Sequence, residues 1–250
     1  MLSPLVLLLA GLSVLATSFL SGVVGMAGGM ILMGVLLLMM DVTAAMVLHG
    51  VTQTGANGWR AFLWRRHVEW RIIGGYAVGS FAMFGLMKLV AAVPDKAVVY
   101  IAMGITPFLV MALPAAWAPD IRRRGAPALC GAAVMFVQLF AGVAGNVLDV
   151  FFQRSAMDRR VVVATKAASQ VLAHLQRIAF FGAFAQAGDL FPLWVYGGAV
   201  GLALAGTSLA ALVLSRMSEK AFRAWSRSII LGVSLVYLAK GLWLVWGGGA

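Results

Sequence analysis

Charged residues are scarce in this sequence, because Asp, Glu, Lys and Arg make up only 11% of its 250 residues while 62% are hydrophobic. A water-soluble protein of this length needs a charged surface, which this composition does not provide. Apolar runs cover most of the chain and are too numerous for a single membrane anchor. The composition therefore predicts an all-α, multi-pass integral membrane protein.

Cysteine is almost absent as well. The single cysteine, Cys130, lies in an apolar run, so the chain can form neither an internal disulfide nor a Cys-based zinc site or iron–sulfur cluster. The 14 methionines are scattered, and no Met-x-x-Met cluster recurs beside His or Cys, which argues against copper. We therefore expect no metal and no cofactor, and we expect Cys130 to be a small buried apolar residue.

Sequence motifs of the common enzyme classes are also missing. The chain contains no GxSxG, HExxH, Walker or GxGxxG pattern in a suitable context. The sequence therefore does not predict an enzyme.

Acidic residues are few: 8 Asp and Glu stand against 19 Lys and Arg, which gives a net charge of +11. The basic residues form short clusters between apolar runs, where the positive-inside rule places them. We therefore interpret the positive charge as a signal of membrane topology and expect no nucleic-acid partner.

Two of the apolar segments are interrupted by glycines. The first segment contains SGVVGMAGGM, from Ser21 to Met30, and the fifth contains AGVAGNVLDV, from Ala141 to Val150. We match Gly142 and Gly145 with Gly22 and Gly25 of the first stretch. The eight apolar segments, most of them near the ~20 residues that span a bilayer, are Leu2 to Met40, Val42 to Trp64, Ile72 to Ala92, Ala97 to Trp117, Pro127 to Phe152, Val161 to Phe184, Leu190 to Leu214 and Ser228 to Trp246.

Loop charge indicates how these segments cross the membrane. If every segment crossed once, the basic loops would be divided between the two faces, against the positive-inside rule. If the fifth segment turns at its glycines and returns, the basic loops at 65–71, 122–124, 154–160 and 216–227 all lie in the cytoplasm, and of the loop residues only Lys96 lies outside. We therefore predict a glycine-tipped hairpin in the fifth segment and, from the matching glycines, another in the first.

Each half of the chain then consists of a glycine-tipped broken hairpin followed by three transmembrane helices, and the two halves begin on opposite faces. This arrangement is an inverted-topology repeat, which suits a transporter because exchanging the conformations of the halves turns an outward-open site inward. We predict an N-terminal repeat at 1–117, a cytoplasmic linker at 118–126 and a C-terminal inverted repeat at 127–250.

A polar pattern occurs twice. DVTAAMVLHGVTQTGANGWR runs from Asp41 to Arg60, and DRRVVVATKAASQVLAHLQR lies 117 residues further on, from Asp158 to Arg177. The shift aligns His49 with Lys166, Gln53 with Gln170, Asn57 with His174 and Arg60 with Arg177. These positions are spaced four, four and three residues apart, which places each set on one face of an α-helix. Each helix therefore carries a polar stripe into an apolar setting, as expected for a path for a polar solute.

The hairpin tips and the polar stripes together form the predicted binding site. Glycines let the backbone approach a solute, and a half-helix that begins at a tip directs free N–H groups toward an anion. Amide donors and cations outnumber acids in the stripes, which favours an anionic solute. The candidate residues are Ser21, Gly22, Gly25, Gly28, Gly29, His49, Gln53, Asn57, Gly142, Gly145, Asn146, Lys166, Gln170, His174 and Arg177.

Several of these residues also have a purely structural interpretation. The glycines could mediate close helix packing through small residues. Arg60, Lys166 and Arg177 could extend to the membrane surface, which the sequence favours for Arg60. Asp149 lies on the return arm of the second hairpin, where it could pair with Lys166 or Arg177, or could carry a proton for coupled transport. His174 competes with Asp149 for the proton-carrying role.

The two glycine stretches, SGVVGMAGGM and the weaker AGVAGNVLDV, together with the chain length and the four-plus-four segment pattern, resemble the TauE/SafE family of sulfite and organosulfonate exporters. The resemblance covers most of the chain. It implies a permease of the bacterial inner membrane for small anions such as sulfite, sulfoacetate, thiosulfate or related carboxylates, coupled to the proton gradient. In this chain Ile31 to Leu38 lacks a proline that often follows the first glycine cluster in the family.

We therefore expect a secondary transporter whose partners are a small anionic solute and the lipid bilayer, with a homodimer left open. A cation or metal permease is one alternative, and it would use Asp149 and the two histidines as ligands. A membrane scaffold or assembly factor without a solute is another, and an intramembrane enzyme is a third.

Overall fold

The computed structural model describes residues 3–24, 27–90, 92–186, 190–214 and 219–247, and within these ranges its regular elements are helices. Two short 3₁₀ turns, η1 (Arg65–His67) and η2 (Ala115–Trp117), lie between them. The α-helices are α1 (Pro4–Val24), α2 (Ala27–Met39), α3 (Val42–Leu63), α4 (Trp70–Val90), α5 (Lys96–Ala112), α6 (Ala126–Ala141), α7 (Gly145–Phe152), α8 (Arg159–Gly182), α9 (Leu193–Leu214) and α10 (Glu219–Trp246).

Both apolar segments that contain glycine stretches are broken, as the sequence predicts. α1 ends at Val24 before α2 begins at Ala27, and α6 ends at Ala141 before α7 begins at Gly145. α6 stops because Gly142 adopts a left-handed conformation with φ of +67°, and its N–H donates to the carbonyl of Gln138.

The helix ends change the glycine pairing proposed from the sequence. α1 and α6 end 117 residues apart, at Val24 and Ala141, and α3 and α8 begin with the same separation. This shift aligns Gly142 with Gly25 rather than with Gly22. The pairing from the sequence was wrong by three residues, because it used the spacing of the glycines and not the positions of the helix ends.

The aspartates that begin the two polar stretches are helix caps. The side chain of Asp41 accepts from the N–H of Ala44 at 2.8 Å, and that of Asp158 accepts from the N–H of Arg160 at 2.8 Å. Each satisfies an N–H group that lacks a partner in the first turn of its helix. The repeated aspartates therefore set where α3 and α8 begin.

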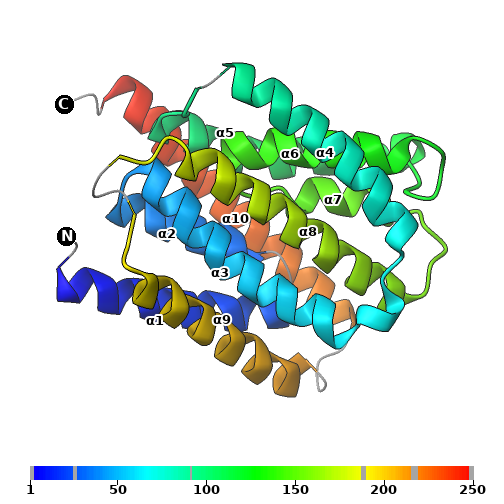
Figure 1. Ribbon diagram of the computed structural model, residues 1–250, viewed down its shortest axis with the longest axis horizontal. Helices are drawn as coiled ribbons and strands as arrows, with labels where there is room; N and C mark the ends of the chain where they lie inside the picture. Colours follow the sequence, from blue (N-terminus) through cyan, green and yellow to red (C-terminus); the bar gives the residue numbers. More distant parts are fainter. Residues whose placement is uncertain (1–2, 25–26, 91, 187–189, 215–218, 248–250) are drawn as a thin grey trace.

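α3 and α8 pack against each other inside the bundle (Figure 1). Around them, α1 packs against α9, α4 against α6, and α5 against α10. Each of these pairs joins one helix from residues 1–117 with one from residues 127–250. The two halves of the chain are therefore interleaved rather than separate.

Four of the described helices, α1, α4, α9 and α10, are long and apolar enough to cross a membrane. The sequence predicts six crossing helices and assigns α1 to a hairpin arm, so the two sets differ. α3 and α8 have 22 and 24 residues, which is long enough, but their polar stripes lower the hydropathy. Because they lie inside the bundle, the neighbouring helices rather than lipid surround much of their surface.

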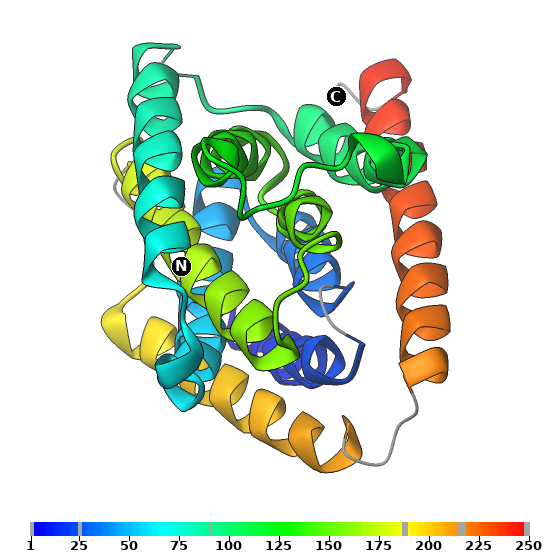
Figure 2. The same ribbon diagram turned by 90° about the vertical axis from the view of Figure 1, so that its right-hand side faces the viewer.

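The basic loops gather at one end of the bundle. The α3–α4, α5–α6 and α7–α8 connections all lie at the right-hand end of Figure 1, which faces the viewer in Figure 2. α1 begins and α10 ends at the opposite end. The clusters at 65–71, 122–124 and 154–160 lie in these connections and in the first turns of α4 and α8.

The short helix α2 is anchored in the core by side chains from three other helices. Tyr100 of α5 donates to the carbonyl of Gly34 at 3.1 Å, and Tyr237 of α10 donates to the carbonyl of Met30 at 2.9 Å. His49 of α3 lies 2.8 Å from the carbonyl of Gly29. These bonds hold the first two turns of α2 against α3, α5 and α10.

Candidate functional site

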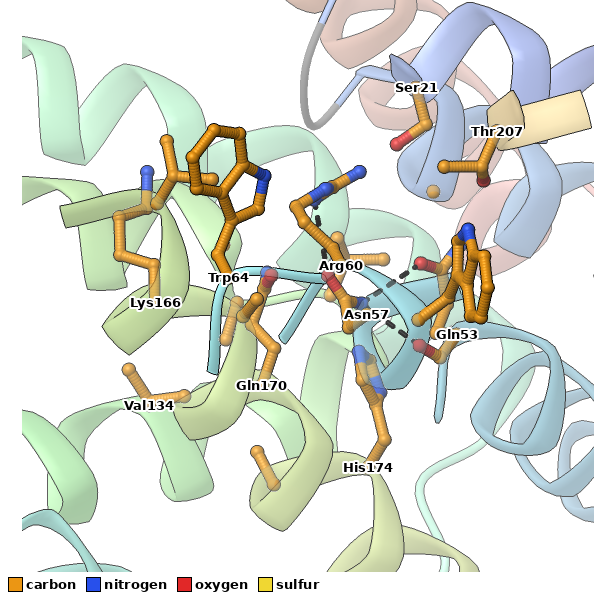
Figure 3. Close-up of a pocket in the computed structure, with 18 of the residues that line it drawn as sticks. Ser21, Gln53, Asn57, Arg60, Trp64, Val134, Lys166, Gln170, His174 and Thr207 are labelled. Atoms are coloured by element: carbon orange, nitrogen blue, oxygen red, sulfur yellow. Dashed lines mark hydrogen bonds between the residues drawn. The ribbon is translucent and has the colours of Figure 1, made fainter. Parts of the chain in front are cut away.

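A cavity of about 790 Å³ lies between α3 and α8 and is also bordered by α1, α2, α6, α7 and α9 (Figure 3). It extends from Gly29 and His49 in the interior to the exposed residues Trp64 and Arg159 at the end of the bundle with the basic loops. Its size falls in the range of small-molecule sites, roughly 300–1,000 Å³.

Residues of both polar stripes and both helix breaks meet in this cavity. In the view of Figure 3, Arg60 and Asn57 lie between Lys166 and Gln170 of α8 on one side and Ser21 and Thr207 on the other. The predicted candidates that line the cavity are Ser21, Gly29, His49, Gln53, Asn57, Gly145, Lys166, Gln170 and His174.

Other predicted candidates lie elsewhere. Gly28 packs against α1 so closely that a Cβ there would overlap the carbonyl oxygen of Thr17, which fits the packing alternative. Gly22 lies in the last turn of α1, and Gly25 lies outside the described residues. Gly142, Asn146 and Arg177 are not among the described residues that line the cavity.

Along α3 the polar stripe forms a chain of hydrogen bonds within the cavity wall. Arg60 donates to the side-chain oxygen of Asn57 at 3.3 Å, and the Asn57 amide donates to the Gln53 carbonyl at 3.0 Å and to its side-chain oxygen at 3.4 Å (Figure 3). These bonds fix the amides in defined orientations. They also hold the Arg60 guanidinium in the wall, although the sequence favours the membrane surface for it.

Beneath the cavity, Arg177 connects the two helix breaks. Its side chain is fully buried, with 0% exposure; Nη1 donates to the Gly142 carbonyl and Nη2 donates to Nδ1 of His49 at 2.7 Å. Because Nδ1 of His49 accepts this bond, its proton is on Nε2, which donates to the Gly29 carbonyl at 2.8 Å. Arg177 and a neutral His49 therefore join the end of α6 to the beginning of α2.

A second histidine lies next to this chain. Nδ1 of His174 is 2.7 Å from the side-chain nitrogen of Gln138, and the rings of His174 and His49 are 6.0 Å apart. Gln138 also lines the cavity. Sequence analysis missed it, although the shift of 117 residues that relates the two stripes aligns Gln138 with Ser21.

The charge in the cavity wall is positive. Arg60, Arg159 and Lys166 line the cavity, and no Asp or Glu is among the described residues that do so. Lys166 pairs with Asp149, which was one of the two pairings considered for that carboxylate. In the described part of the chain, no group of three or more His, Cys, Asp or Glu side chains is placed to hold a metal ion.

The family profile described as "Sulfite exporter TauE/SafE" matches residues 9–237, which is nearly the whole chain. The chain belongs to the TauE/SafE family. No curated protein matches the chain. No solved structure matches it. The resemblance seen in the two glycine stretches is confirmed, and membership indicates a membrane transporter of the sulfite type.

This TauE/SafE protein has further cavity residues that the sequence did not single out. Trp59 and Leu63 of α3 and Trp64, which directly follows α3, line the exposed part of the cavity, and Thr207 and Ser208 of α9 also line it. Arg160, next to the lining residue Arg159, lies over the Trp64 ring at 5.8 Å. Trp59 lies between the stripe residues Asn57 and Arg60 along α3, and Trp64 follows the helix, but both reach the cavity only because of how α8 and α9 approach α3.

Proposed function

We propose that this protein is a secondary transporter that carries small sulfur-containing anions, such as sulfite, thiosulfate or sulfoacetate, across the bacterial inner membrane by alternating access. The observation that carries the proposal is the fully buried Arg177 beneath the cavity. Its described hydrogen-bond partners are a carbonyl and a neutral imidazole, and its Nε has no described partner. A buried cation without a carboxylate is costly, and an anion in the cavity above it offsets that cost.

The cavity wall supplies the groups that an oxyanion needs. Gln53, Gln170 and Asn57 provide amide groups from both halves of the chain, and Arg60 and Lys166 provide positive charge. Charge-assisted hydrogen bonds to such donors are stronger than neutral ones. We propose that these side chains hold the oxygens of the anion and that the backbone at Gly29 and Gly145 also lies against it.

The helix pairs support the proposed inverted repeat of residues 1–117 and 127–250, joined by the linker at 118–126. If α1 to α5 correspond in order to α6 to α10, exchanging the halves converts the α1–α9 pair into the α6–α4 pair, and both pairs are present. The same exchange leaves the α3–α8 and α5–α10 pairs unchanged, and both of these are also present. A site between α3 and α8 then lies on the proposed symmetry axis.

The positive-inside rule places the end with the basic loops in the cytoplasm. In this conformation the cavity extends toward that end, so we propose that it faces the cytoplasm. The hydrogen bonds of Arg177 and His49 lie at the opposite, inner end of the cavity. We propose that they close the outward path and that they break when the two halves exchange conformations.

For proton coupling, the geometry favours His174 over Asp149. His174 lines the cavity, where a bound anion could contact it, and it faces His49, Gln138 and Arg177 across the α3–α6–α8 junction. Asp149 is paired with Lys166 and is not among the described lining residues. We therefore propose that His174 carries the proton and that Asp149 orients Lys166.

Labelled sulfite uptake into proteoliposomes tests the class of solute. We expect thiosulfate and sulfoacetate to compete with sulfite, because they carry similar oxyanion groups, and we expect divalent metal ions not to compete. Taurine and lactate complete the panel, with and without a pH gradient. Competition by metal ions and not by anions would instead support a cation permease.

Replacing His174 with Gln is expected to remove most of the pH dependence of uptake, because Gln can bond with Gln138 but cannot titrate in the physiological range. Asp149→Asn serves as the comparison and is expected to keep the pH dependence while weakening uptake through the unpaired Lys166. Uptake of labelled thiosulfate, whose own charge does not change over this range, is measured from pH 5.5 to 8 for each variant. If the His174→Gln, Asp149→Asn double variant kept its full pH dependence, neither residue would carry the coupling proton.

A further inference from the structure

A second cavity, of about 440 Å³, lies at the end of the bundle that carries the basic loops. It is formed by the chain between α5 and α6, the first turn of α6 and Arg154 after α7; the α5–α6 connection crosses the face shown in Figure 2. No residue that lines it also lines the central cavity. It is therefore separate from the proposed transport site.

Three guanidinium groups surround this cavity, from Arg123, Arg124 and Arg154. Arg154 is held in place because its Nη1 donates to the carbonyls of Ala116 at 2.8 Å and Ala118 at 3.2 Å. Arginine in such a cluster suits a phosphate group, since its planar donors bind two oxygens at once.

One carboxylate, Asp120, also lines the cavity. The backbone N–H of Arg122 donates to it and lowers the pKa of its carboxyl, so it is ionised at neutral pH. Arg122, which is not among the lining residues, lies 3.6 Å from the second oxygen of Asp120 and offsets part of this charge. The cavity therefore remains net positive.

The edge of the cavity is apolar and exposed. Trp117 and Leu129 both line it and are 74% and 59% exposed. Phe136, seven residues after Leu129, lies on the same face of α6 and is 46% exposed. A tryptophan beside basic residues at the end of a membrane bundle is typical of the lipid interface, and the α6 face below it could contact an acyl chain.

We propose that this cavity binds the phosphate headgroup of an anionic phospholipid, with Arg123, Arg124 and Arg154 around the phosphate and an acyl chain along Leu129 and Phe136. A soluble phosphate would use the arginines but not the exposed apolar face, which is why the geometry favours a lipid. The cavity lies at the proposed linker between the two halves. A bound lipid therefore holds that linker at the membrane surface, whatever solute the central cavity carries.

Native mass spectrometry of the full chain in detergent tests the proposal with dioleoyl phosphatidylglycerol, and with phosphatidylcholine as the neutral lipid. The variant is Arg123→Gln, Arg124→Gln, because both side chains are exposed and their loss leaves the bonds of Arg154 intact. The matched control is Arg66→Gln, Arg71→Gln, which removes two exposed charges near the same end of the bundle from residues that line neither cavity.

We expect the wild type to retain phosphatidylglycerol in preference to phosphatidylcholine. The Arg123→Gln, Arg124→Gln variant should bind phosphatidylglycerol about 20-fold more weakly, and the control variant should bind it like the wild type. Equal weakening in both variants would show diffuse attraction to surface charge and overturn the site. Displacement of the lipid by equal concentrations of inorganic phosphate or glycerol 3-phosphate would show a site for soluble anions and overturn the lipid proposal. Since the readout is lipid binding, failure of this test leaves the transport proposal standing.

Discussion

Replacing Arg177 with Gln is expected to lower anion uptake by about 100-fold or more. The reason is that the guanidinium donates hydrogen bonds to two buried acceptors, which are costly to leave without a donor. The Gly142 carbonyl and Nδ1 of His49 would both lose their donor. The link between the break after α6 and the beginning of α2 would then be lost together with the buried positive charge. Uptake of labelled sulfite into proteoliposomes is the measurement.

Two further variants separate charge from geometry at this position. Arg177→Lys keeps the positive charge, but one ammonium group does not reproduce the planar guanidinium that donates to two acceptors at once. We therefore expect weak uptake and a monodisperse protein. His49→Gln can accept from Arg177 and donate to Gly29, so we expect it to keep much more activity than His49→Ala.

Thermal stabilisation by sulfite provides a second measurement for these variants. If the charge of Arg177 stabilises the bound anion, Arg177→Gln should lose much of the stabilisation by sulfite, whereas Arg177→Lys should keep part of it. A purely structural role would lower the melting temperature without changing the increment that sulfite adds. Wild-type uptake by Arg177→Gln would contradict both roles.

Replacing Gly28 with Ala is expected to destabilise the protein by about 1–3 kcal/mol, the usual cost of adding a methyl group to a closely packed interior. The added Cβ would overlap the Thr17 carbonyl, which belongs to the backbone of α1 and cannot rotate away. α2 must therefore shift, and Gly29 moves with it. Because the Gly29 carbonyl accepts from His49 at 2.8 Å, we expect uptake to fall as well.

Gly201→Ala is the matched control for this substitution. Gly201 lies in the apolar helix α9, and a Cβ added there would have nothing within 4 Å. We expect its melting temperature to equal or slightly exceed that of the wild type, since Ala favours a helix more than Gly does. Equal melting temperatures for Gly28→Ala and the wild type would show that α1 and α2 can separate without cost.

Several features of the fold follow from local sequence. The breaks after α1 and α6 occur where glycines cluster, and the glycine at the second break adopts a conformation that other residues disfavour. The stripes on α3 and α8 follow from side-chain spacing, because residues three and four positions apart lie on the same face of any α-helix. The repeated Asp41 and Asp158 could be recognised from the sequence, but the sequence analysis did not assign them a capping role.

Other features depend on contacts between distant segments. Arg60 and Arg177 hold equivalent places in the two stripes, yet Arg60 lies in the cavity wall and Arg177 lies buried beneath it. Lys166 and Gln138 are similar cases, because the partner of each belongs to another helix. A single sequence does not specify which of two equivalent stripe positions faces the cavity, because the helices that pack around α3 differ from those that pack around α8.

The sequence by itself determined that the protein is a helical membrane protein with two broken segments and two polar stripes, and its glycine stretches indicated the TauE/SafE family. These properties arise from composition, helical periodicity and backbone freedom, which act over a few residues. Only the tertiary structure decided that the stripes meet in one cavity and that Arg177 and His49 join the two breaks. The reason is that these contacts join different helices, and the hydrogen bond between His49 and Arg177 connects residues 128 positions apart.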